Sequence, residues 1–469
     1  MKRFLAVFAS LMLVLGFAAS AFAIHAEIPS ETKAVVAKGT TQVTLGGEIR
    51  FRGEYQNNTD LDSNNEPTDS FAAYDSRVRL RIQADVSKNT TGVVHLETGS
   101  DPRDGSSSNT SDTYTWGVGG SENTGTLGQN LGNGKRGTLN VLEAWIQHKG
   151  SGLLGIPAGI KIGHMPVVLG YGLFYNHGKF GDDAIYLWIN PVKKMEIGLM
   201  GVKLAENTRE SADDADMYTL LLNYDINKDS KIGFDASYLD LKRVSLTSTG
   251  VSTATASDKG TKLWNFGLRG NTKVAGLGIK ADIELQSGDY KPATGNKIKA
   301  RGYAYMVGLD YKLNPVTLSL DYAYGSGDGN PNDTKNKLFL NTLSNTQKYT
   351  YVYDFRAPTA TGSRNTGLAN TQYWKLGANA DLTKNLNADV NLYLLRAAKK
   401  TVVSIGGNPT KGDSKNLGTE IDWKATYKID KNLTYFVEGG YLWTGGFYDS
   451  ATVASDNAYA IRHGIQLKF

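Results

Sequence analysis

The last residues of the chain, 457–469, alternate between apolar and polar side chains and end on an aromatic residue. The apolar face carries Tyr459, Ile461, Ile465, Leu467 and Phe469. The opposite face includes Arg462, Gln466 and Lys468. A period of two places successive side chains on opposite sides of an extended backbone, so this segment predicts a β-strand with one apolar and one wet face.

The N-terminal residues have the pattern of a secretory signal peptide. Lys2 and Arg3 precede an apolar run over 4–18, and Ala-Phe-Ala at 21–23 is a small-x-small cleavage site. The run is shorter than the roughly 20 residues that a membrane-spanning helix needs, which disfavours an uncleaved anchor. We therefore expect residues 1–23 to be removed, with 24–40 as a short periplasmic lead-in.

The remaining composition limits the possible folds and partners. No other apolar run is long enough for a membrane helix, and the chain has no cysteine, which excludes disulfides and thiolate metal sites. The net charge of +5, part of which lies in the signal peptide, is too small to indicate a nucleic-acid partner. A membrane chain without apolar helices has to close its sheet, because no sheet edge can face lipid.

Alternating segments like the last one recur along residues 41–469, and they predict about 18 strands of membrane-spanning length. Their connections alternate between tight turns, such as 87–89 and 430–432, and long polar loops, such as 100–137 and 326–371. A soluble β-sandwich would not alternate its loop lengths in this way. We therefore predict one all-β domain over 41–469, a single transmembrane antiparallel β-barrel with short periplasmic turns and long extracellular loops. The predicted strands are 42–55, 74–86, 91–99, 138–148, 158–165, 183–189, 195–204, 216–226, 231–241, 261–271, 277–287, 302–313, 316–325, 372–382, 386–395, 417–429, 433–443 and 457–469.

A closing strand that ends on Phe resembles the last strand of bacterial outer-membrane barrels, whose ending is recognised by the barrel-assembly machinery. The resemblance implies the outer membrane of a Gram-negative bacterium, with lipid and lipopolysaccharide around the barrel and Phe469 as the contact for assembly. Aromatic residues near strand ends, such as Tyr74, Tyr303, Trp374 and Tyr441, suit the boundary between acyl chains and headgroups.

The first two strands have the most informative lumen face. If their apolar residues face lipid, alternation turns five arginines inward: Arg50, Arg52, Arg77, Arg79 and Arg81. Four carboxylates share this face: Glu48, Glu54, Asp75 and Asp85. Barrel closure adds Arg462 and Lys468 from the last strand to the same wall.

This wall has two interpretations. Arginine forks suit carboxylates, sulfates and phosphates, and their field in a narrow channel attracts anions. Alternatively, the carboxylates neutralise the arginines in a lattice that stiffens the wall. Other predicted lumen positions have mixed charge, which argues against a uniformly cationic pore: Lys280, Asp282, Glu284, Asp310, Lys312, Glu420, Asp422, Lys424 and Lys428.

Several segments resemble the alginate-export porin family, large outer-membrane barrels of about 18 strands. Residues 416–422, followed by the 430–432 turn and Glu-Gly-Gly-Tyr at 438–441, are similar to the family's penultimate hairpin. Ser-Gly-Asp at 326–328 resembles its loop motif after a Tyr-rich strand, and Gly-His-Met at 163–165 stands where the family usually has Gly-Arg-Gln. The resemblance implies this fold and a channel role.

We therefore expect an outer-membrane channel, a porin, for passive diffusion of small hydrophilic, preferably anionic, solutes. One alternative is an export conduit for an acidic polysaccharide such as alginate, and another is a plugged surface receptor or structural barrel that binds a partner through its loops. The six histidines show no partners at catalytic or metal spacing, so we expect neither an enzyme nor a cofactor or metal. Loop 166–182 is the candidate to fold into the pore.

Overall fold

The computed structural model describes residues 41–63, 69–99, 114–115, 138–152, 155–206, 214–242, 244–247, 250–253, 259–330, 332–343, 349–405 and 407–469. The predicted signal peptide and the 24–40 lead-in lie outside the described residues, as does most of loop 100–137. Among the described residues, no helix is long and apolar enough to cross a membrane.

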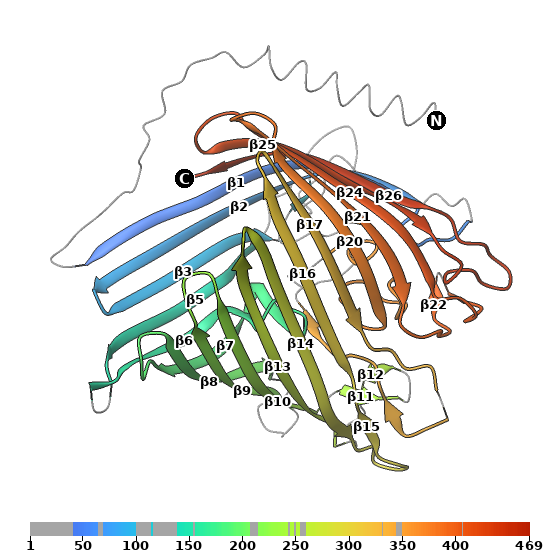
Figure 1. Cartoon of the computed structure of the whole chain (residues 1–469), viewed down its shortest axis with the longest axis horizontal. Helices are drawn as coiled ribbons and strands as arrows, with labels where there is room; N and C mark the ends of the chain where they lie inside the picture. Colours follow the sequence, from blue (N-terminus) through green and yellow to red (C-terminus); the bar gives the residue numbers. More distant parts are fainter. Residues whose placement is uncertain are drawn as a thin grey trace, which may run out of the picture. The chain divides into compact units, whose positions relative to one another are not determined.

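Eighteen long strands form one antiparallel sheet that closes on itself (Figure 1). The last of them pairs with the first, with Leu467 opposite Ile49 and Tyr459 opposite Asn57. The predicted strand count is confirmed, and every predicted strand overlaps an observed one, although the strand predicted at 183–189 begins at Tyr175, within the predicted loop 166–182. The strands are β1 (Gln42–Asn57), β2 (Ser70–Ser87), β3 (Thr90–Gly99), β5 (Thr138–Ser151), β6 (Pro157–Val168), β7 (Tyr175–Ile189), β8 (Met195–Ala205), β9 (Ala215–Asp225), β10 (Lys231–Leu241), β13 (Thr261–Val274), β14 (Leu277–Tyr290), β16 (Tyr303–Leu313), β17 (Val316–Gly325), β20 (Thr371–Asp381), β21 (Leu386–Ala397), β24 (Asn416–Lys428), β25 (Leu433–Thr444) and β26 (Ala458–Lys468).

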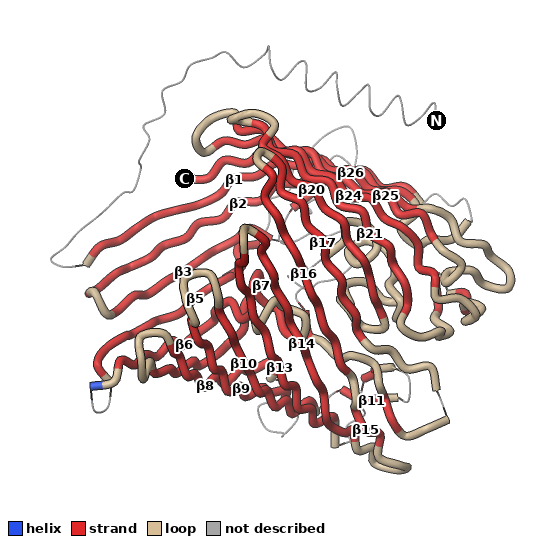
Figure 2. The backbone as a smooth tube through the Cα atoms, viewed as in Figure 1, coloured by secondary structure: helices blue, strands red, loops and turns tan. Residues whose placement is uncertain are grey.

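Short turns and long loops alternate along the chain, so they gather at opposite ends of the barrel (Figure 2). Residues 88–89 join β2 to β3 and residues 314–315 join β16 to β17, whereas residues 326–370 join β17 to β20. The described parts of the long connections contain eight short strands: β4 (Tyr114–Thr115), β11 (Val244–Leu246), β12 (Val251–Thr253), β15 (Ile298–Ala300), β18 (Lys335–Asn336), β19 (Thr342–Leu343), β22 (Ser404–Ile405) and β23 (Asn408–Pro409).

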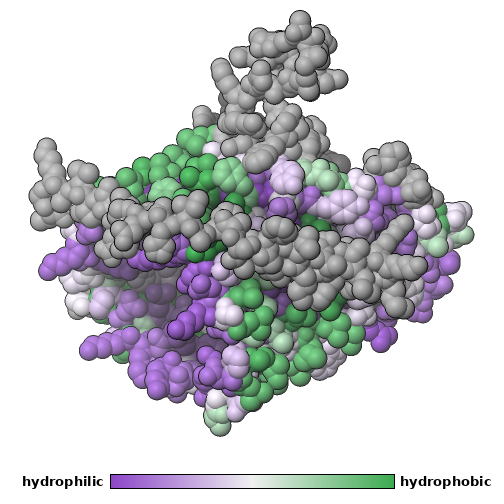
Figure 3. Space-filling model, turned by 90° about the horizontal axis from the view of Figure 1, so that it is seen from above, coloured by the Kyte–Doolittle hydropathy of each residue, from purple (hydrophilic) through white to green (hydrophobic). Residues whose placement is uncertain are grey.

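The strands have an apolar outer face and a polar inner face. On β2, Val78 and Leu80 are 36 % and 38 % exposed, whereas Arg77, the residue before Val78, is 6 % exposed. Hydrophobic and hydrophilic side chains accordingly gather in separate regions of the surface (Figure 3). Alternation along each strand therefore assigns one set of positions to lipid and the other to the lumen.

This parity predicts opposite effects for arginine at neighbouring positions of β2. We expect Leu80→Arg to destabilise the inserted barrel by about 2–4 kcal/mol, because it exposes a cation to lipid near the midplane. The matched control is Gln83→Arg, since Gln83 hydrogen bonds with Arg81 and Asp85 on the lumen face. Urea titration of the barrel folded into liposomes measures the difference, and equal destabilisation by both variants would contradict the assigned faces.

Candidate functional site

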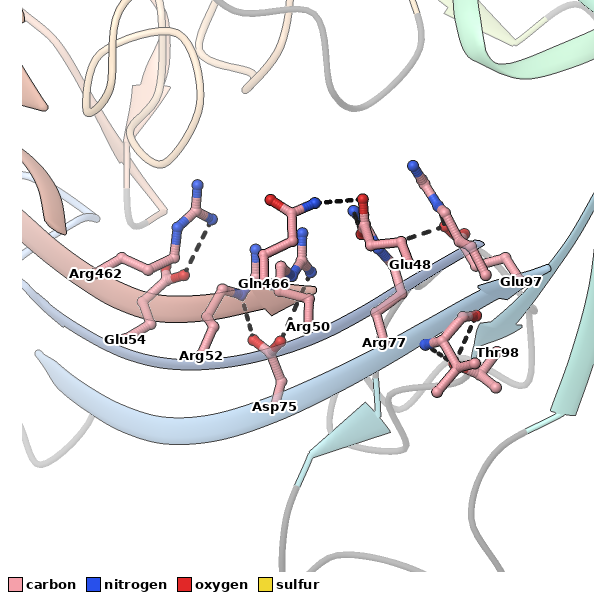
Figure 4. Close-up of polar contacts among 12 residues, drawn as sticks. Glu48, Arg50, Arg52, Glu54, Asp75, Arg77, Glu97, Thr98, Arg462 and Gln466 are labelled. Atoms are coloured by element: carbon pink, nitrogen blue, oxygen red, sulfur yellow. Dashed lines mark hydrogen bonds and ion pairs between the residues drawn. The ribbon is translucent and has the colours of Figure 1, made fainter. Parts of the chain in front are cut away.

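Arg50 and Arg52 of β1 and Arg77 of β2 lie on one inner wall and contact neighbouring carboxylates (Figure 4). Arg52 Nε donates a hydrogen bond to Asp75 at 2.6 Å, and Arg50 Nη2 lies 3.7 Å from the other oxygen of Asp75. Arg77 Nε donates to Glu48 Oε1 at 2.9 Å. Arg50 and Arg77 are opposite each other in the β1–β2 register, so two positive charges are neighbours at the middle of this wall.

Further along β2, an arginine pairs with a carboxylate that was not predicted from the sequence. Arg79 Nε donates to Glu97 Oε2 of β3 at 2.5 Å, and the Glu97 side chain is only 1 % exposed. Arg81 instead donates to the neutral amide of Gln83 at 2.9 Å, and Asp85 accepts from Gln83 and Thr91. Arg81 therefore makes no ion pair with a carboxylate in the described part of the chain.

The closing strand β26 adds its predicted cations to the same wall. Arg462 Nε donates to Glu438 at 2.8 Å, and Arg462 Nη1 lies 3.5 Å from Glu54. Lys468, opposite Glu48 in the β1–β26 register, is exposed at the end of its strand. The structure thus brings the seven predicted cations and four predicted carboxylates together on one wall, whereas their anion-guiding role stays a prediction.

A further cation on this wall, Lys161 of β6, was missed. Its Nζ lies 3.9 Å from the centre of the Trp145 ring, and Trp145 Nε1 donates to Glu143 at 2.8 Å. His95 Nδ1 is 3.0 Å from the same carboxylate. Lys161 makes no ion pair within the described residues and is close enough to Arg81 for the two charges to interact.

The wall across the barrel, on β10, β13 and β14, is rich in buried carboxylates. Asp235, Asp282 and Glu284 are all fully buried, and Arg269 pairs with Asp235. These strands lie about half-way round the sheet from β1 and β2, so the wall that is rich in carboxylates lies opposite the wall that is rich in arginine.

Residues 349–370 fold into the barrel and pack on its inner face. The amide N–H groups of Val352 and Tyr353 donate to the two oxygens of Glu420 at 2.5 and 2.8 Å, and the N–H of Tyr351 donates to Asp422 at 3.0 Å. Val352 and Tyr353 are fully buried. The carboxylates of β24 therefore anchor this inward segment by its backbone.

A second anchor ties the inward segment to the arginine wall. Arg356 Nη2 donates to Glu54 Oε1 of β1 at 2.8 Å, and Arg356 Nη1 donates to the carbonyl of Tyr351 at 2.6 Å. Its guanidinium carbon lies 4.0 Å from the centre of the Tyr351 ring, a distance suited to a cation–π contact. Glu54 is thus shared between Arg356 and Arg462.

Arg364, on the same inward segment, is not paired with a carboxylate of the described residues. Its side chain is exposed and makes no hydrogen bond or ion pair with the described residues. Surrounding protein lowers the pKa of Arg364 through desolvation, while the charge of Asp60 opposes that effect. Arg364 is therefore accessible to solvent although protein surrounds it, as expected for a side chain that lines a narrow aqueous channel.

Part of loop 166–182 also reaches across the lumen, as the sequence analysis proposed. The N–H of Tyr171 donates to Asp282 of β14 at 2.8 Å. Gly170 has a φ of +57°, and a Cβ there would lie 2.6 Å from the Asp282 carboxylate, so this approach requires glycine. The N–H of Thr342 donates to the carbonyl of Phe174 at 2.9 Å, which joins this loop to the connection that contains residues 349–370.

Comparison with known proteins gives a family match and several similar folds. Residues 199–461 match the family model described as alginate export. The chain is similar to OccK9 (OpdG) of Pseudomonas aeruginosa, with a TM-score of 0.53 and 12 % identity over 91 % of this chain and 98 % of that chain. For OprD of the same organism these values are 0.53, 10 %, 91 % and 94 %, and for OpdK they are 0.52, 11 %, 91 % and 98 %. At such identities the likeness shows the fold alone. The curated proteins gave no match.

Proposed function

Because the chain belongs to the alginate export family, outer-membrane barrels with a channel or export role, we propose that it is a diffusion channel for small hydrophilic anions. The proposal includes secretion through the signal peptide 1–23 and assembly through Phe469. The permeant anion passes between the arginine wall and the inward segment 349–370. We assign no catalytic step to any residue.

The arrangement of cations along one wall carries this proposal. From the extracellular side, Arg364 and Arg356 come first, followed by Arg52, then Arg77, and finally Arg81 near the periplasmic end of β2. Three cations of this region, Arg364, Arg81 and Lys161, make no ion pair with the described carboxylates. A carboxylate or phosphate moving along the wall therefore meets successive guanidinium donors, and at the two ends of the row Arg364 and Arg81 are not neutralised by a carboxylate of the described residues.

Export of an acidic polysaccharide is the second candidate, and the family match favours it. The same row of cations suits a chain of carboxylates, because each sugar unit would meet another guanidinium as the polymer advances. A plugged barrel is the third candidate, since two inward segments cross the lumen. The three candidates differ in how ions and polymers pass.

Planar-bilayer recording of the purified protein distinguishes the diffusion channel, the export conduit and the plugged barrel. For a diffusion channel we expect discrete conductance steps, a reversal potential that favours chloride in a KCl gradient, and concentration-dependent interruption by galacturonate, a sugar with one carboxylate. Long-lived block by alginate oligomers applied from the periplasmic side alone would favour export. Absence of steps in protein that is folded, as judged by its gel mobility before and after heating, would contradict both transport proposals.

A further inference from the structure

The outer surface of β6–β9 differs from the rest of the lipid-facing barrel, and we propose that it binds a second copy of this chain. The difference begins with the height of its apolar belt. On β16, alternate positions from Tyr303 to Leu313 are apolar, which spans ten residue steps. At about 3.3 Å per residue and a tilt of about 40°, that belt is about 25 Å tall, as lipid requires.

The belt is much shorter on β7. Ile185, Leu187 and Ile189 face outward, at 47 %, 46 % and 40 % exposure, and cover only four residue steps. The same arithmetic gives a height of about 10 Å. The next outward position is Asp183, whose side chain is 75 % exposed. A bilayer against this wall would have to thin or leave a charged residue at the depth of acyl chains.

Ionisable residues form a row above the short apolar belt of β7. His164, Asp183, Lys203 and Asp216 are successive register partners on β6, β7, β8 and β9. His164 Nδ1 lies 2.9 Å from Asp183, and Lys203 Nζ lies 3.0 Å from Asp216. Because groups of basic and acidic type alternate along the row, a facing copy can place opposite charges against each other.

The apolar part of this outer wall is hollowed, and its exposed aromatic side chains among the described residues, Tyr218 and Tyr224, lie on β9 at one edge. Two adjoining depressions of about 520 and 480 Å³ share Ile162 and Gly163, and the second is also lined by Gly201. In the described residues of β3, β5, β6, β7 and β8, the large apolar side chains with high exposure are all aliphatic. Exposed Tyr and Trp residues, which mark contact with lipid headgroups, occur instead on β9 and on strands such as β13, β16 and β20.

A second copy fits this surface better than lipid does. Short apolar belts are relieved by association, and a copy of the same chain has a belt of the same height. Copies in one membrane share their orientation, so their contacts close around an axis along the membrane normal, as symmetric oligomers do. The contact would remove the short belt and the charged row from lipid together. A locally thinned bilayer or a different membrane protein are the competing occupants.

Disulfide trapping tests the proposal directly, because the natural chain has no cysteine. Ile185→Cys and Leu199→Cys place a thiol on the proposed contact, and Val307→Cys places one on the full-height belt of β16, where its parent side chain has a similar exposure of 44 %. After oxidation in native outer membranes, we expect a cross-linked band of two chains from at least one contact variant and none from Val307→Cys. Equal cross-linking at both sites, or none at the contact, would overturn the proposal.

A variant that blocks the surface provides an independent readout. Gly201 has room for a side chain, since the nearest heavy atom to an added Cβ is 3.9 Å away, so Gly201→Trp is expected to fold. We expect native mass spectrometry in mild detergent to show an oligomer for the wild type and for Ala378→Trp, an exposed position on β20, but single chains for Gly201→Trp. A wild type that is monomeric, with or without bound lipid, or a Gly201→Trp variant that stays oligomeric, would refute the second-copy contact.

Discussion

Replacing the five arginines of β1 and β2 with glutamine is expected to reverse the selectivity of the channel. The variant combines Arg50→Gln, Arg52→Gln, Arg77→Gln, Arg79→Gln and Arg81→Gln. Their removal leaves Glu48, Asp75 and Glu97 on the wall without the guanidinium groups that neutralise them. Carboxylates then dominate the field in the lumen, so the reversal potential in a KCl gradient should shift from the anion side to the cation side.

The dependence on salt and a control that changes the charge of the same wall in the opposite direction make this expectation specific. The shift should shrink between 0.1 M and 1 M salt, because the Debye length falls from about 10 Å to about 3 Å. The control combines Glu48→Gln and Glu97→Gln, which remove two of the carboxylates and should strengthen preference for anions. If the five-fold variant inserts normally but keeps the wild-type reversal potential, the arginines serve only to brace the wall.

The architecture could be predicted because period-two alternation decides both the strand positions and the face of each side chain. Lipid on one side and water on the other allow no other arrangement of β1 or β2, so the inward arginines follow from sequence parity. On β5, this argument fails. The register shifts where His95 pairs with Glu143 and Leu96 with Val141, so Leu142 is an extra residue and the parity of β5 changes there. The contact between Trp145 and Lys161 was missed for that reason.

The inward segment 349–370 was beyond prediction for a different reason. Its sequence is that of a polar loop, and its position depends on single contacts between distant parts of the chain. Arg356 is 302 residues away from its partner Glu54, and Val352 is 68 residues away from Glu420. No local pattern specifies such pairs. Gly-Tyr-Gly at 170–172 gave a weaker local signal, because glycine permits the close approach to Asp282 that the structure shows.

Removing the connection that contains the inward segment is expected to produce the largest change in conductance. The ends of the deletion already adjoin, since the N–H of Asn370 donates to the carbonyl of Ser326 at 3.2 Å. A short Gly-Ser linker in place of residues 327–369 therefore preserves the pairing of β17 with β20. We expect single-channel conductance to rise at least about two-fold, because a barrel of this width has an aqueous interior unless chain segments fill it. Unchanged conductance would place the ion path away from residues 349–370.

A single substitution at the anchor should loosen the segment without removing it. Glu420→Gln replaces one of the two oxygens that accept the N–H groups of Val352 and Tyr353 with an NH₂ group, so one amide donor loses its acceptor. The matched control is Asp321→Asn, which makes the same change from carboxylate to amide on the lumen face, where Asp321 contacts Lys280 and Lys375 rather than the inward segment. We expect Glu420→Gln to add rapid transitions to higher conductance and Asp321→Asn to keep steady steps. Transitions of equal frequency in the two variants would show that the loss of a lumen carboxylate, and not the anchoring of residues 349–370, controls the open state.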